Sequence, residues 1–88
     1  MPRYIFDVHD DGPVEWGDDG VECADRDEIE RRVHTLIVAA QQRQVARGSL
    51  EALTTIYVHH ESNGIVLVAS VRPGEDVQFG WTPGSGGE

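Results

Sequence analysis

The sequence predicts an α+β fold: a two-layer β-β-α-β-β arrangement in which one long helix packs on a mainly antiparallel sheet. Three observations predict it. Apolar and polar residues alternate near both ends of the chain, as they do in half-buried strands. One long segment between them has helical periodicity, and an Asn-Gly pair joins the last two alternating segments. Two hairpins therefore flank one helix, within a chain of 88 residues that is enough for a single domain.

The first alternating segment, residues 3–9, is expected to form a strand. Its larger apolar side chains share one face: Tyr4, Phe6 and Val8. Asp, Gly and Pro at 10–13 favour a turn directly after it. Residues 14–16 are a candidate second strand, and residues 21–23 a further extended piece. Together these segments predict an N-terminal hairpin with aromatic residues on its inner face.

A long helix is predicted from residue 26 to residue 47. Asp25 can cap it by accepting a hydrogen bond from a first-turn amide, and Glu28 can reach back to the amide of the cap. The apolar stripe has helical spacing and consists of Ile29, Val33, Leu36, Ile37 and Ala40. Gly48 supplies the left-handed residue that ends such helices.

Two more strands, residues 54–60 and 65–72, are expected after a connection at 50–53 that contains two leucines. Asn63-Gly64 between them is typical of a tight hairpin. Strict alternation in the second of these strands predicts two apolar faces, with Ile65, Leu67, Ala69 and Val71 on one and Val66 and Val68 on the other. A strand that is apolar on both faces indicates a central position or a dimer contact.

The domain is predicted to span residues 1–72, followed by a Gly/Pro-rich C-terminal tail at 73–88. Pro73-Gly74 marks the boundary, and the composition of the tail is typical of a flexible segment. An alternation of apolar residues inside the tail leaves open a short added strand: Val77, Phe79 and Trp81.

Composition and net charge exclude several classes of partner. The chain holds 16 acids against 7 basic residues, for a net charge of −9, and 11 of those acids lie in residues 1–30. Such a chain repels a phosphate backbone, so we expect no nucleic-acid partner. No apolar run approaches the length of a membrane span, so we expect no membrane partner. The lone Cys23 cannot form an internal disulfide, and a cytoplasmic location is expected.

Four segments carry a resemblance to a known family. They are the opening MPRYIFDVHDDG, the DDGVE segment, the Asp25-capped helix with a glycine after it, and the closing hairpin NGIVLVASV. Over residues 1–72 the chain resembles a family of small bacterial proteins known only as a domain of unknown function. The resemblance implies the same fold and carries no established activity. A looser similarity is to the antitoxin half of bacterial toxin–antitoxin pairs, in which a small acidic domain binds a basic toxin.

A calcium-loop template matches part of the N-terminal segment. Residues at its ligand and turn positions are Asp7, His9, Asp11, Gly12, Glu15 and Asp18. The histidine is a poor ligand for a hard cation, and the segment before it reads as a strand rather than a helix. Two solvated acidic turns are therefore the favoured interpretation, and we expect no bound metal and no cofactor.

Catalytic arrangements are not indicated. His59 and His60 are adjacent in a strand and point to opposite faces, so they cannot share one metal ion. Cys23 precedes the helix cap among acids that disfavour a thiolate, so a small buried apolar role is expected. No serine lies in a nucleophile elbow, and the glycines of the tail precede no helix that could bind phosphate. Trp16 and Trp81 are expected to cover the thin core. The chain is accordingly predicted not to be an enzyme.

The function expected is a non-catalytic protein-interaction or regulatory module, with a homodimer as one form of it. Capping and helix pairing account for the acids near the start of the helix. What remains is an acidic interaction patch: Asp10, Asp11, Glu15, Asp18, Asp19 and Glu22. The alternatives are a small-molecule or metal-binding accessory protein and an antitoxin-like partner of a basic toxin. Whether the aspartates of the patch converge on one point or spread over a surface would separate these functions.

Overall fold

A computed structural model describes residues 2–17, 20–49, 51–62 and 64–82. Its elements are β1 (Arg3–His9), β2 (Val21–Glu22), α1 (Arg26–Arg47), β3 (Thr54–His60), β4 (Gly64–Val71) and β5 (Gln78–Trp81). Leu50, Asn63 and the end of the tail, 83–88, lie outside the described residues. No helix among the described residues is long and apolar enough to cross a membrane.

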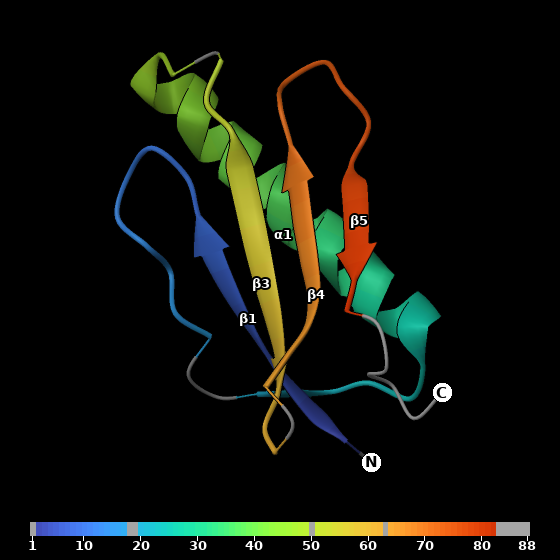
Figure 1. The fold of residues 1–88 in the computed structure, drawn as a ribbon. Coiled ribbons are helices and arrows are strands. Elements are labelled where there is room, and N and C mark those ends of the chain that lie inside the picture. The colour runs from blue at the N-terminus through green and yellow to red at the C-terminus, as the bar shows by residue number, and fades with distance from the viewer. Residues whose placement is uncertain (1, 18–19, 50, 63, 83–88) are drawn as a thin grey trace.

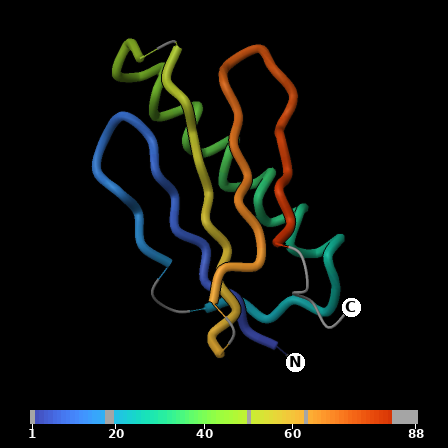
Figure 2. The backbone as a smooth tube through the Cα atoms, viewed as in Figure 1, coloured from blue at the N-terminus to red at the C-terminus, as the bar shows by residue number. Residues whose placement is uncertain are grey.

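The strands form one antiparallel sheet in the order β2-β1-β3-β4-β5. Helix α1 crosses diagonally behind this sheet in Figure 1, so that it covers one face only, and Figure 2 traces the same path along the backbone. This confirms the predicted α+β fold with one helix on a mainly antiparallel sheet. The candidate strand at 14–16 is reduced to a single bridge, in which Glu15 pairs with Val8.

Helix α1 begins and ends where its caps predict. The side chain of Asp25 accepts a hydrogen bond from the Glu28 amide, and Gly48 takes the left-handed conformation with φ 79°. The carboxylate of Glu28 reaches back to the amide of Ala24, one residue before the predicted amide. The bond to Asp25 satisfies a first-turn amide that the helix leaves without a partner, and the bond from Ala24 holds the residue before the cap.

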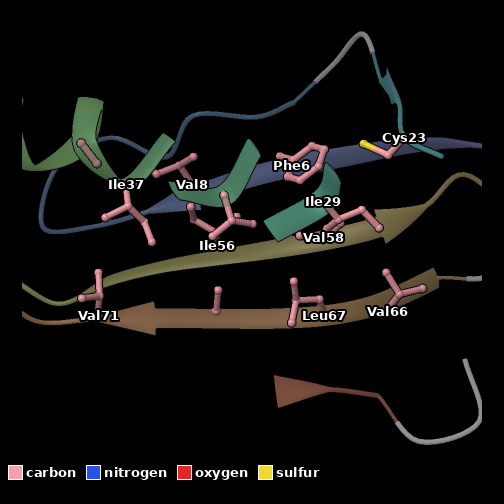
Figure 3. Packing of buried hydrophobic residues seen from close by; sticks show 13 residues of the cluster. Phe6, Val8, Cys23, Ile29, Ile37, Ile56, Val58, Val66, Leu67 and Val71 are labelled. Atoms are coloured by element: carbon pink, nitrogen blue, oxygen red, sulfur yellow. The ribbon is translucent and has the colours of Figure 1, made fainter. Parts of the chain in front are cut away.

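The core lies between α1 and the covered face of the sheet (Figure 3). Its buried hydrophobic residues are Phe6, Val8, Cys23, Ile29, Val33, Ile37, Ala40, Ile56, Val58, Val66, Leu67, Ala69 and Val71. Two polar side chains, Gln44 and Thr54, are buried with them. They satisfy each other in part, since the amide nitrogen of Gln44 donates to the hydroxyl of Thr54 at 2.6 Å. The predicted helical stripe is confirmed, with Leu36 only partly buried.

A bulge in β4 corrects the predicted faces of that strand. Val58 pairs with Leu67, but the next residue, His59, pairs with Ile65, so β4 carries one extra residue at this point. Val66 therefore joins the core beside Leu67, and Ile65 moves to the uncovered side, where it is 42% exposed. Strict alternation put Ile65 and Leu67 on the same face, and it was wrong because a bulge breaks the two-residue period.

Strand β5 extends the sheet beyond residue 72, where the sequence placed the end of the domain. Its four residues pair with β4 from Leu67 to Ser70. Trp81 lies against α1, since its indole nitrogen donates to Glu30 at 3.1 Å and the guanidinium of Arg26 sits 4.5 Å above its ring. The ordered sheet thus includes part of the predicted tail, and the alternative of a short added strand is confirmed.

Candidate functional site

The predicted acidic patch is tied to arginines of the same chain. Asp10 is the most enclosed: its side chain is 4% exposed, it accepts a hydrogen bond from the Gly12 amide at 2.8 Å, and it lies 3.5 Å from Arg47. Asp11 also pairs with Arg47, near the C-terminus of α1. This contact, which we call the clasp, holds the loop after β1 against the C-terminal end of α1. The role of these acids is therefore structural.

The clasp changes the pKa of Asp11. A hydrogen bond from Ser49 and the ion pair with Arg47 hold the pKa of the Asp11 carboxyl below its usual value. The same contact raises the pKa of Arg47. Asp11 therefore stays ionised to lower pH than a free aspartate, and what the clasp adds to stability is lost only as the pH falls through this lowered pKa.

The other described acids of the patch lie in different places. Glu15 pairs with Arg43 of the helix at 3.2 Å, and Glu22 lies 3.8 Å from Arg3 near the start of β1. Asp18 and Asp19 fall outside the described residues. The described acids of the patch therefore spread along the length of β1 rather than converging on one point.

The calcium-loop positions do not assemble in the described part of the chain. Asp7, the first position, instead bonds to His59 and to the Gly17 amide. Asp11, the fifth, bonds to Arg47. The described residues contain no group of three or more histidine, cysteine or acidic side chains that could hold a metal ion, with Asp18 outside them.

Polar, aromatic and aliphatic side chains lie together on a different surface, the side of the sheet away from α1. We call it the open face, and its residues are Ile5, Asp7, His9, Thr55, Tyr57, His59, Ile65, Val68 and Ser70. In Figure 1 the strands β1, β3 and β4 lie in front of helix α1, so the side of the sheet away from the helix is turned toward the viewer. No described helix covers them, and most remain partly accessible to solvent.

Asp7 and His59 form the polar centre of the open face. One carboxylate oxygen of Asp7 lies 2.8 Å from Nε2 of His59, and the other accepts a hydrogen bond from the Gly17 amide at 2.9 Å. These bonds let Asp7 be buried although it sits on the uncovered side of the sheet. A carboxylate that orients an imidazole also occurs in hydrolases. Among the described residues, the hydrogen-bond partner of His59 is Asp7 rather than a hydroxyl or a thiol.

Aromatic rings line the open face next to this pair. The ring of His9 lies edge-on to Tyr57, with centroids 4.8 Å apart, and edge-on to Trp16 at 5.7 Å. Trp16 is 64% exposed at the β1 edge. The prediction that Trp16 covers the core was therefore wrong, because the chain at 14–17 runs along the β1 edge instead of forming a full strand.

Cys23 behaves as a packing residue. It is 3% exposed within the core, and burial, with the nearby charge of Glu28, raises the pKa of its thiol. A raised pKa keeps the thiol protonated and unreactive near neutral pH. The expected small buried apolar role is confirmed.

Sequence reasoning noted the alternation that creates the open face but assigned function to the acidic loops. The number of layers would have predicted the open face. One helix can cover only one face of a sheet, so the other face is left available for contact with a partner. The partners of the acids were harder to predict, since Arg43 and Arg47 lie far from them in the sequence.

No family model, curated protein or solved structure matches this chain significantly. The resemblance to a bacterial family of unknown function stays a prediction. Functional inference therefore depends on the geometry of the open face.

Proposed function

We propose that this chain is a non-catalytic protein-interaction module whose contact surface is the open face. One observation carries the proposal: a five-stranded sheet has a helix on one face, while its other face gathers aromatic, imidazole and aliphatic side chains from three strands. As the sequence predicts, we place the module in the cytoplasm.

The composition of the open face supports this function. The cores of protein interfaces are rich in aromatic residues and poor in charged ones. The nine residues of the open face contain one acid, Asp7, and no arginine, in a chain with 16 acids, and the paired Arg3 and Glu22 lie at its β2 edge. Because Asp7 already bonds to His59 and Gly17, a partner could cover it without leaving a carboxylate that lacks hydrogen bonds.

The acidic patch supports the antitoxin-like alternative less well. Its described members already have arginine partners within the chain, at Arg3, Arg43 and Arg47. A basic toxin would have to replace these pairs, and for Asp10 it would have to reach a side chain that is 4% exposed. Exchange of one surface ion pair for another gains little free energy.

A photo-crosslinking experiment in cells tests the proposal. A benzophenone amino acid replaces Tyr57, at the centre of the open face, or Val38, which is 54% exposed on α1. We expect a protein adduct from position 57 and none from position 38. The two variants should melt at similar temperatures, which establishes that both are folded. Absence of any adduct at position 57, or adducts only at position 38, would refute the open face as the contact surface.

A further inference from the structure

We infer that the partner of the open face is a second copy of this chain, docked face to face about a two-fold axis. This inference rests on the proposed function and specifies its partner. The two sheets would pack at roughly 10 Å, with one helix on the outside of each, to give four layers in the order helix, sheet, sheet, helix.

The chemistry near the centre of the face is self-complementary. In a two-fold interface, residues close to the axis meet their own copies, so a charged residue there meets its like. Beside the Asp7–His59 pair, Thr55, Tyr57 and Ser70 carry hydroxyls, which both donate and accept hydrogen bonds. An aromatic ring such as Tyr57 also pairs well with its own copy. The open face can therefore contact itself without unpaired charges.

The distribution of charge points the same way. Each chain carries a net charge of −9, so two copies repel each other, and the repulsion is smallest where their contact lies away from the acids. Of these acids, Asp7 on the open face is held by His59, and Glu22 at the β2 edge of the same side is paired with Arg3. A strongly basic partner would be attracted elsewhere, toward the acid-rich loops. The near-neutral open face is thus the surface on which like-charged copies can approach.

The size of the face fits a reversible dimer. The five strands contain 7, 2, 7, 8 and 4 residues. Each residue covers about 16 Å² of a sheet, so the flat footprint is on the order of 450 Å². Side-chain relief makes the accessible area larger than this footprint. The face is still smaller than the roughly 800 Å² per partner of a standard interface, as expected for a weak, reversible dimer. We expect a dissociation constant in the micromolar range.

Sedimentation velocity on the purified full chain tests the inference, at concentrations from about 5 to about 500 µM, chosen to bracket a micromolar dissociation constant. We expect the mass to rise with concentration from 9.7 kDa toward twice that value. Ile65→Arg adds a cation to the open face and is expected to weaken the dimer at least tenfold. The matched control is Val38→Arg, which changes an exposed valine on the outer side of α1 and should leave the dimer unchanged.

Amide NMR spectra on dilution of the unmodified chain give a second measurement that does not depend on a variant. Dimer-dependent shifts are expected in residues 5–9 and 55–59 and not on the exposed side of α1. Shifts confined to β5, which forms one edge of the sheet, would overturn the inference in favour of edge pairing.

The two proposals can fail separately. A chain that stays monomeric throughout the concentration range, yet crosslinks at position 57 to a protein of different mass, refutes the second copy and leaves the interaction module standing. A chain that neither dimerises nor crosslinks there refutes both.

Discussion

Gly17 fixes the segment that borders the open face. Its amide donates to Asp7, and its backbone lies so close to β1 that a Cβ would sit 2.4 Å from the carbonyl oxygen of Phe6. That oxygen belongs to the backbone of a core strand and cannot move aside easily. A glycine is therefore required here for close approach.

We predict that Gly17→Ala lowers the free energy of unfolding by about 1–3 kcal/mol, since the segment must shift away from β1 and release its bond to Asp7. Urea denaturation measures this loss. Gly12→Ala is the control: its Cβ would meet the flexible end of the Arg47 side chain at 3.3 Å, so the change should be below about 0.5 kcal/mol. Equal stability of the two variants would contradict the role assigned to Gly17.

At the residue scale, sequence reasoning predicted types of role better than partners. Asp25, Cys23 and Gly48 do what their local chemistry predicts, because capping, burial and a left-handed turn depend on near neighbours. The partner of Asp7 could not be predicted in this way. Its partner His59 lies 52 positions away, and only the pairing of β1 with β3 brings the two together.

At the scale of elements, β5 is the least expected part of the fold. The composition of its segment predicts flexibility, yet four residues pair with β4 and two aromatic rings lie toward the helix. Phe79 packs edge-on to His34, with ring centroids 5.7 Å apart. Average composition missed this strand because alternating aromatic residues can order a short segment among glycines and prolines.

We expect the double variant Phe79→Ala/Trp81→Ala to lose about 2 kcal/mol of stability, because each ring is partly buried and full burial of such a side chain gives about 1.5–3 kcal/mol. Thermal or urea unfolding provides the measurement. Gln78→Ala, at an exposed position of the same strand, should cost less than about 0.5 kcal/mol. A double variant as stable as the unmodified chain would mean that β5 does not support the core.

At the scale of the whole molecule, the long helix, the antiparallel pair of strands after it and the single covered face followed from periodicity and turn residues. The site did not follow, because it depends on which face the helix leaves bare and on which arginines reach the acids. Both are properties of the assembled sheet. The net charge of −9 remains the strongest global constraint on how copies of this chain meet.

That charge predicts how salt acts on the proposed dimer. Raising NaCl from 20 to 300 mM shortens the screening length from about 20 Å to about 6 Å, which reduces repulsion between two acidic copies. We expect the dimer to tighten roughly three- to tenfold, measured by sedimentation. A parallel series with sucrose separates screening from solvent exclusion. Weakening with salt would indicate a contact between opposite charges instead.

The bulge in β4 has a consequence for how such a protein can change. One extra residue puts Val66 into the core and Ile65 on the outside. A deletion of one residue there would restore the two-residue period and return the strand to regular pairing. Such a deletion would also take one side chain out of the core, because the bulge lets β4 place two successive residues, Val66 and Leu67, under the helix.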